Sequence, residues 1–292
     1  MVKYTSLRPR SHNESTIGWL GQVTYEIQAI GQQNLEIEQA LTMKKTLSNN
    51  WAKCGVEPGD TLLIHTSLRR TLTKHNTTPE VVLESFLDVL GEKGTLLLPL
   101  FNFDFPKGVP FNIRTSPSHM GALTEVGRLY PVAIRSGHPI YSFAVIGANA
   151  KHFEVDNFSG YGPDSPFAIL RKLNGKIGVL DLSDLHSMTF YHHIEEMHEV
   201  PYRYHKKFTG KYTDADGVTT ERTYGLFVRA IEKGILTDVD PMGELLWEKG
   251  KYSGDRPKEG TGFRVIAANE MYAEVSEIIK AGRAEELLYS IE

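Results

Sequence analysis

Short apolar runs alternate with amphipathic segments along the first two thirds of the chain. The apolar runs have the length and composition of buried strands, and they lie at residues 61–65, 96–98, 142–146 and 177–180. Apolar residues at helical spacing fill the segments at residues 38–54, 79–90, 120–129 and 165–173. Strands alternating with helices are typical of α/β proteins. We therefore expect a layered α/β sandwich around a central, largely parallel sheet.

The pattern changes after Pro201. Residues 202–212 and 218–224 flank Asp214-Ala215-Asp216-Gly217, which is a hairpin turn signal. Helical spacing dominates the remainder, apart from a short strand at residues 263–267. These features predict an added β-hairpin and C-terminal helices. Residues 1–36 are polar and weakly periodic, so we expect an N-terminal extension or oligomer arm there and one domain over residues 37–292.

Composition narrows the functional classes. The chain has 292 residues, is 40% hydrophobic and carries a formal net charge of −4, which disfavours general nucleic-acid binding. Its single cysteine, Cys54, excludes an internal disulfide and suits a reducing compartment. No apolar run has the length of a signal core or a membrane span. We expect a soluble, cytoplasmic protein without membrane or nucleic-acid partners, and a homodimer is compatible with the N-terminal arm.

The segment with the most chemistry is Thr189-Phe190-Tyr191-His192-His193-Ile194-Glu195-Glu196, which follows a predicted strand. On a helix, residues three or four apart share a face, so His192 can meet Glu195 or Glu196. A carboxylate beside an imidazole fixes its tautomer and stabilises its protonated form, as a general base requires. The alternative is a solvated helix face. A metal-dependent hydrolase with His192, Glu196 and His198 as ligands is also open, although the two-histidine zincin spacing is missing.

Other polar segments lie at strand ends and helix starts. His65-Thr66-Ser67-Leu68 follows the first strand, and its backbone amides could hold a phosphate with help from Arg69 and Arg70. Thr115 to Gly121, Arg135-Ser136-Gly137-His138-Pro139 and Gly162 to Pro166 are the other such segments. Each of these alone is also explained by helix capping or by a polar turn.

In this order and spacing, the segments resemble the aminoglycoside 3-N-acetyltransferase family, which transfers an acetyl group from coenzyme A to a sugar amine. The resemblance covers about residues 38–212 and includes Gly162-x-x-Ser165-Pro166 and Thr189-x-x-His192-x-x-Glu195. It implies direct attack of the amine on acetyl-CoA or another acyl-CoA, without a metal. His192 would be the base, Glu195 would orient it, and Thr189 is a candidate donor to the oxyanion.

The resemblance also assigns binding residues. Those expected to hold coenzyme A are His65, Thr66, Ser67, Leu68, Arg69, Thr115, Ser118, Gly121, Ser142 and Phe143. Those expected to meet the amino-sugar acceptor are Phe103, Asp104, His138, Asp164 and Tyr204.

Three departures from the antibiotic pattern make the chain similar to a branch of the family that acylates nucleotide-linked amino sugars for surface polysaccharides. Arg69 and Arg70 replace small residues, and an aromatic loop at residues 99–108 could pack on a sugar face or a nucleobase. In the segment at residues 200–208, Arg203 and Lys206, with the adjacent Lys207, could meet a diphosphate. We therefore expect a nucleotide-linked amino-deoxysugar as acceptor, with an aminoglycoside antibiotic as the alternative. A catalytically silent sugar or nucleotide binder is the remaining option.

Overall fold

The computed structural model describes the backbone of residues 13–256 and 259–292, and the side chains from residue 32 within those ranges. The chain divides into two compact units, Met1–Met43 and Lys44–Glu292. Helix α1 (Asn13–Lys53) has 41 residues and continues past residue 43. The division expected at residues 36 and 37 therefore falls inside a continuous helix.

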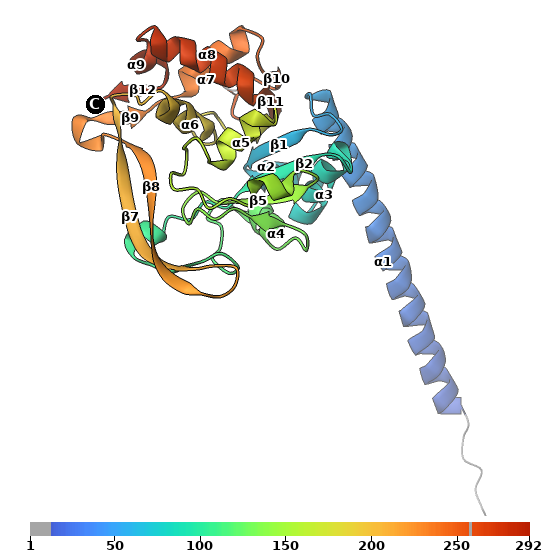
Figure 1. Cartoon of the computed structure of the whole chain (residues 1–292). Helices are drawn as coiled ribbons and strands as arrows, with labels where there is room; N and C mark the ends of the chain where they lie inside the picture. Colours follow the sequence, from blue (N-terminus) through green and yellow to red (C-terminus); the bar gives the residue numbers. More distant parts are fainter. Residues whose placement is uncertain (1–12, 257–258) are drawn as a thin grey trace, which may run out of the picture. The chain divides into compact units, whose positions relative to one another are not determined.

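The remaining elements belong to the second unit (Figure 1). Its helices are α2 (Leu68–His75), α3 (Pro79–Leu90), α4 (Ala122–Arg128), α5 (Pro166–Lys172), α6 (Phe190–Met197), α7 (Asp240–Glu248), α8 (Ala268–Lys280) and α9 (Ala284–Leu287). Its strands are β1 (Thr61–Thr66), β2 (Thr95–Pro99), β3 (Phe111–Asn112), β4 (Ile134–Arg135), β5 (Phe143–Gly147), β6 (Lys176–Leu180), β7 (Arg203–Thr213), β8 (Thr219–Arg229), β9 (Ile235–Thr237), β10 (Ser253–Gly254), β11 (Phe263–Ala267) and β12 (Tyr289–Ile291).

A seven-stranded sheet, in the order β10-β11-β6-β1-β2-β5-β4, forms the centre of this unit within the described residues. Its three central strands, β6, β1 and β2, are parallel, and every pairing outside them is antiparallel. The expected layered α/β fold is confirmed, but the sheet is mixed rather than largely parallel, because only two of its six described pairings are parallel. The register pairs Thr66 with Leu180, so β1 and β6 end side by side. In parallel sheets, such adjoining carboxyl ends are where binding loops meet.

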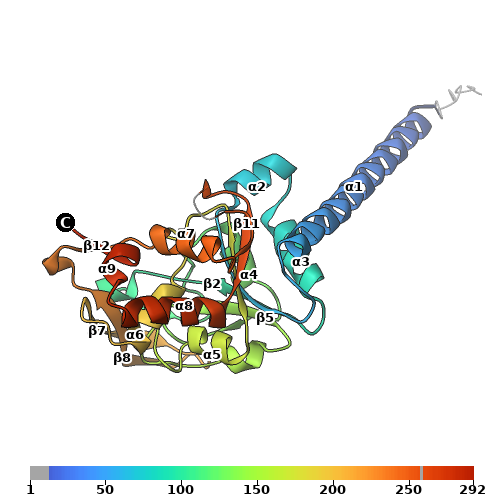
Figure 2. The same ribbon diagram turned by 90° about the horizontal axis from the view of Figure 1, so that it is seen from above.

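Helix boundaries follow from local capping. Thr78 accepts a hydrogen bond from the Val81 amide at the start of α3, and Pro79 occupies the first turn, where its missing N–H costs nothing. Ser165 caps the Ala168 amide of α5 in the same way. In both Figure 1 and Figure 2, α6 and α8 lie together, and the two helices are in contact. Burial between them fixes the position of α6.

The expected hairpin is present and long. Strands β7 and β8 pair antiparallel over 11 residues each, and β3 joins them at the edge as a second sheet. Asp214 closes the turn by accepting from the amides of Asp216 and Val218, while Gly217 supplies a left-handed φ of 83°. In Figure 1 this ribbon starts among the C-terminal elements beside α6, and its far end lies near the β4 edge of the central sheet, where the Tyr212 hydroxyl donates to the Gly137 carbonyl. The hairpin thus brings the start of β7 against α6.

Candidate active site

The start of α6 holds a paired histidine and glutamate. His192 Nδ1 lies 2.8 Å from Glu195 Oε2, at the i,i+3 spacing expected from the sequence. The Glu195 side chain is only 2% exposed, whereas that of His192 is 20% exposed. Because Nδ1 is the engaged nitrogen, Nε2 is the one left without a protein partner among the described residues. A histidine held in this way can exchange a proton through Nε2.

Arg203, at the start of β7, completes the cluster. Its Nε lies 2.8 Å from Glu195 Oε2, its Nη2 lies 2.7 Å from His192 Nδ1, and its Nη1 donates to the Phe227 carbonyl over 2.8 Å. The arginine side chain is 5% exposed. The diphosphate contact expected of Arg203 is therefore wrong, because its guanidinium is buried in an ion pair. The sequence does not indicate this contact, because Arg203 lies 11 positions after His192, beyond the end of α6.

These distances are compatible with two tautomers of His192. If Nδ1 carries the proton, it donates to Glu195 and Nε2 keeps a free lone pair. If Arg203 donates to Nδ1, the proton sits on Nε2 and the ring cannot act as a base there. An ionised Glu195 favours the first arrangement, because a carboxylate is the stronger acceptor for the Nδ1 proton.

The surroundings keep His192 neutral and Glu195 charged. Burial lowers the pKa of His192, and the charge of Arg203 lowers it further against the opposing effect of Glu195. Burial by itself would raise the pKa of Glu195, but Arg203 and the His192 hydrogen bond hold that pKa below its usual value. A neutral imidazole beside a carboxylate is the resting state that a general base needs.

The His192 pocket has a volume of about 510 Å³ and is walled by the hairpin, α6 and the tyrosine pair Tyr141 and Tyr161. It is lined by Tyr141, Tyr161, Leu185, His192, Arg203, Tyr204, Lys206, Phe208, Leu226, Phe227, Val228, Arg229, Ile231 and Thr237. The ring of Tyr161 meets that of His192 edge to face, with centroids 5.3 Å apart. Three of the lining residues are cationic and none of the fourteen is Asp or Glu. The pocket is therefore aromatic and basic.

The residues expected to meet the acceptor are dispersed. Tyr204 lines the His192 pocket and is 42% exposed. His138 is completely buried, and Asp104 is held by Lys107 and His119 at 3.0 and 3.2 Å. Phe103 and Asp164 are exposed and are not among the residues that line the pocket. Only Tyr204 of the five is brought to His192.

Thr189 occupies the position before α6, with its hydroxyl 3.4 Å from the Ser187 carbonyl. It is not part of the pocket lining. No sequence motif marks Tyr141 or Arg229, which reach the pocket from the loop before β5 and from the end of β8. Their contribution follows from the tertiary arrangement.

A second cleft, of about 500 Å³, lies at the carboxyl ends of β1 and β6. Ser67, Arg69, Arg70 and Lys74 line it together with Asp181, Gly260 and Thr261. Ser67 is the residue before α2, so the first amides of that helix are directed to this end. Asp181 takes a left-handed φ of 55° and accepts from Thr71 and from the Gly262 amide, so both of its carboxylate oxygens have partners. Three cations against this one carboxylate leave the cleft with a net positive charge, which suits an anionic ligand.

The other residues expected to hold coenzyme A differ in exposure. Leu68 and His65 are buried, Thr66 is half-buried, and burial lowers the pKa of His65 to about 3, so the ring is neutral. Thr115 and Gly121 are exposed, and the Ser118 hydroxyl contacts that of Thr124 at 2.9 Å.

Ser142 and Phe143 are completely buried. Ser142 accepts from Arg135 Nε, and Phe143 packs edge to face on Phe101 and Phe167. Neither side chain offers surface to a ligand in this structure.

The alternative metal site has no geometric support. His198 pairs with Ser276 and Glu196 with Ser159, both at 2.8 Å, and so the three residues considered have separate partners. In the described ranges, no group of three or more His, Cys, Asp and Glu side chains could hold a metal ion. The same ranges contain no helix that is long and apolar enough to span a membrane.

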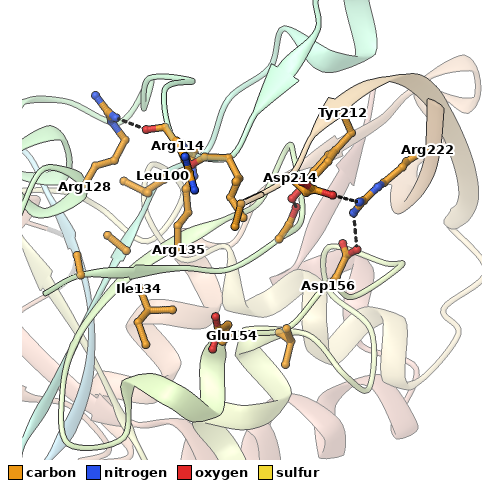
Figure 3. Close-up of a pocket in the computed structure, with 16 residues that line it drawn as sticks. Leu100, Arg114, Arg128, Ile134, Arg135, Glu154, Asp156, Tyr212, Asp214 and Arg222 are labelled. Carbon is orange, nitrogen blue, oxygen red and sulfur yellow. Dashed lines mark hydrogen bonds and ion pairs between the residues drawn. The ribbon is translucent and has the colours of Figure 1, made fainter. Parts of the chain in front are cut away.

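Figure 3 shows a further cavity, of about 540 Å³, between the β4 edge and the hairpin. Its walls are mostly apolar, and Arg222 bridges Asp156 and Asp214 across it. Arg135 reaches this region but is held by Ser142 and by the carbonyls of Ile113 and Ser116. The motif that contains Arg135 therefore anchors loops, and the cavity is separate from the His192 pocket.

A layered α/β fold with a buried histidine–glutamate pair beside a pocket is compatible with an enzyme that uses a general base. Comparison with known families identifies which family the chain represents. The model of the aminoglycoside 3-N-acetyltransferase family matches residues 63–280. The chain belongs to this family.

Two curated relatives show how far this sequence has diverged within the family. Aminoglycoside N(3)-acetyltransferase VII of Streptomyces paromomycinus is 31% identical over 176 residues, covering 53% of this chain and 60% of the relative. Aminoglycoside N(3)-acetyltransferase IX of Micromonospora chalcea is 29% identical over 178 residues, covering 54% and 63%. The matched segment thus spans about three fifths of the length of these relatives.

Solved structures share the fold. The aminoglycoside acetyltransferase AAC(3)-Xa superposes with a TM-score of 0.68 at 24% identity, covering 85% of this chain and 98% of its own. AAC-VIa bound to sisomicin gives a TM-score of 0.70 at 20% identity, covering 82% and 98%. A binary complex of AAC-IIIb with CoASH gives 0.69 at 21%, covering 82% and 96%.

Proposed function

We propose that this protein is an acyl-CoA-dependent N-acyltransferase that acetylates an amine of an amino sugar. Family membership and the names of the curated relatives favour an aminoglycoside as the acceptor class. The observation that carries the proposal is the pairing of His192 with a buried, ionised Glu195 on the wall of a pocket large enough for a sugar.

The proposed step is direct attack. The acceptor amine loses a proton to His192 Nε2 and forms a bond to the thioester carbonyl carbon. The carbon–sulfur bond then breaks, and the coenzyme A thiolate leaves and is protonated. Glu195 accepts a hydrogen bond from Nδ1–H throughout and stays ionised, so it holds the ring in place and stabilises the imidazolium that forms. Thr189 remains our candidate for donation to the oxyanion, a contribution worth roughly 3 kcal/mol in enzymes where such a donor has been removed.

The cleft at α2 suits the phosphates of coenzyme A. Arg69, Arg70 and Lys74 supply three cations beside the first turn of a helix, and both features favour anions. If the phosphates of coenzyme A bind in this cleft, its acyl end can extend along the carboxyl ends of the neighbouring strands. We assign the Ser67–Arg70 segment to the coenzyme on this basis.

A nucleotide-linked amino-deoxysugar is the second candidate acceptor, and the charge of the His192 pocket favours it. Glu195 neutralises Arg203, which leaves Lys206 and Arg229 as cations with no carboxylate among the lining residues. An aminoglycoside is a polycation, and a site built for it should carry the opposite charge. Lys206 and Arg229 would instead complement a diphosphate, while Tyr204 and Phe208 offer aromatic faces to a sugar or base.

The test is release of free thiol from acetyl-CoA and longer acyl-CoAs, measured with aminoglycosides and with nucleotide-linked amino-deoxysugars at fixed ionic strength. Turnover with either class supports the acyltransferase proposal, and the ratio of kcat/KM values chooses between the acceptors. If acyl-CoA binds but no amine is acetylated, the protein is a binder without catalytic activity, and the proposal of an acyltransferase is overturned. The matched variants Lys206→Glu and Lys207→Glu change the net charge of the protein equally, but only Lys206 lines the pocket. A change in acceptor preference in the Lys206 variant alone would therefore be an effect of the charge inside the pocket.

A further inference from the structure

Helix α1 carries a heptad repeat. Positions separated alternately by three and four residues run without a break from residue 20 to residue 41, and they are Leu20, Val23, Ile27, Ile30, Asn34, Ile37 and Leu41. Six of these seven are apolar, and the seventh is asparagine. All lie inside one continuous helix. An apolar repeat of 3.5 residues in a long helix is the pattern of a coiled coil.

The part of this seam whose side chains are described is open. Ile37 is 51% exposed and Leu41 is 55% exposed. Burying a large aliphatic side chain is favourable, and two such residues one helical turn apart on one face form a stripe that a partner helix would cover. In heptad terms, Leu20, Ile27, Asn34 and Leu41 occupy a positions and Val23, Ile30 and Ile37 occupy d positions.

We propose that residues 20–41 form a parallel, two-stranded coiled coil with the same segment of a second copy of this chain. The a positions argue for this partner. In a parallel pair in register each a residue meets its own copy, so Asn34 meets Asn34. One buried asparagine at an a position fixes the register and favours two strands, at some cost in stability.

Charges flanking the seam permit this arrangement. Residues at g positions face those at the e positions of the next heptad in the partner, which places Glu26 opposite Gly31 and Gln33 opposite Glu38. No pair of like charges is created. The flanking charges therefore allow two copies of this helix to pair in register, as Asn34 at its a position favours.

The seam is long enough for a stable dimer. Its 22 residues extend about 33 Å at 1.5 Å per residue. Full burial of an aliphatic side chain removes roughly 60–120 Å² from water, as its transfer free energy implies. Six apolar residues from each of two helices would together bury about 700–1,400 Å², which reaches the range of about 1,200–2,000 Å² seen in specific interfaces.

Light scattering after size exclusion of the full-length protein tests the proposal. We expect the mass of a dimer for the natural sequence and of a monomer for Ile37→Glu. Leu35→Glu is the matched control, because Leu35 is 49% exposed and apolar but occupies a b position, outside the seam. It should remain a dimer. A monomeric or trimeric natural protein, a dimeric Ile37→Glu variant, or equal disruption by Leu35→Glu would each overturn the proposal.

Direction is tested by cross-linking. In a Cys54→Ser background, Asn34→Cys places one thiol at an a position of each helix. A parallel pair in register brings these thiols together, within disulfide reach, and mild oxidation should convert most of the protein to a covalent dimer. A dimer by light scattering that stays uncross-linked would overturn the parallel arrangement.

Discussion

His192 and His138 invite comparison, because both lie in polar segments that the sequence marks as functional and both have a lowered pKa. His138 is completely buried, and its ring nitrogens are both used: Nδ1 accepts from the amides of Ile140 and Tyr141, and Nε2 meets the Gly225 carbonyl. In His192, Nδ1 is hydrogen-bonded to Glu195, and Nε2 has no protein partner among the described residues. The first histidine is a structural connector, and only the second can exchange a proton with a ligand.

A lowered pKa therefore does not by itself identify a catalytic histidine. Burial lowers the pKa of both rings, and that of His138 falls to about 4. The two rings differ in how many of their nitrogens have hydrogen-bond partners and in whether the ring faces a pocket. Sequence motifs do not reveal these partners, because the Gly225 carbonyl that contacts His138 Nε2 belongs to β8, 87 residues further along the chain.

Replacing His192 by alanine should produce the largest effect. Loss of a general base removes about 10²–10⁴-fold in rate, so kcat/KM for amine acetylation should fall by that factor while acyl-CoA binding persists. Release of free thiol measures kcat/KM, and calorimetry measures the binding of acyl-CoA. His193→Ala is the neighbouring control, since His193 is completely buried against the Tyr161 carbonyl and does not line the pocket. Near-normal turnover by the His192→Ala variant would show that His192 is not the general base.

Replacing Arg203 should change the pH dependence of catalysis. His192 must be neutral to accept a proton, and the positive charge of Arg203 lowers its pKa. Arg203→Met should therefore raise that pKa and move the acidic limb of the kcat/KM profile to higher pH. The same change leaves Glu195 buried without its cation, which costs about 3–5 kcal/mol. Arg203→Lys keeps the charge and should keep the limb near its original position, and an unmoved limb in a folded Arg203→Met protein would contradict the assigned role.

His138 should instead affect folding. His138→Ala leaves two buried amides without an acceptor, and each such group costs about 1–3 kcal/mol of unfolding free energy. The folded histidine has a pKa of about 4 against 6.5 in the unfolded chain, so the unfolded state binds more protons between these values. Stability should fall as the pH drops through that window, by about 3 kcal/mol from this group. Urea unfolding at several pH values should show a flatter dependence in the variant, with turnover of the folded enzyme preserved.

Local patterns predicted the second unit well. The helix at 79–90 and the strand at 263–267 have the expected bounds, because apolar spacing and capping residues there agree. The hairpin at 202–224 was expected, but its second strand extends to Arg229 because β8 packs on β7 over its whole length. The His192–Glu195 pair was predictable because helix geometry joins residues three apart. Arg203, Tyr141 and Arg229 were not, because tertiary packing alone brings them together.

The smallest expected effect is that of Cys54→Ser, and it tests the direct mechanism. An enzyme that passed the acyl group through a thioester would need a reactive thiolate with a base at hand. Cys54 is only partly accessible, and burial together with Asp255 raises the pKa of its thiol, which keeps it protonated near neutral pH. It follows α1 and does not line the His192 pocket. We expect kcat/KM of Cys54→Ser within about two-fold of the natural protein, because a residue outside the reacting groups should not change the barrier. Intact mass spectrometry after mixing with acetyl-CoA alone should show no added acetyl group, whereas an acetylated Cys54 that is discharged by amine would establish a two-step route and displace His192 from the first step.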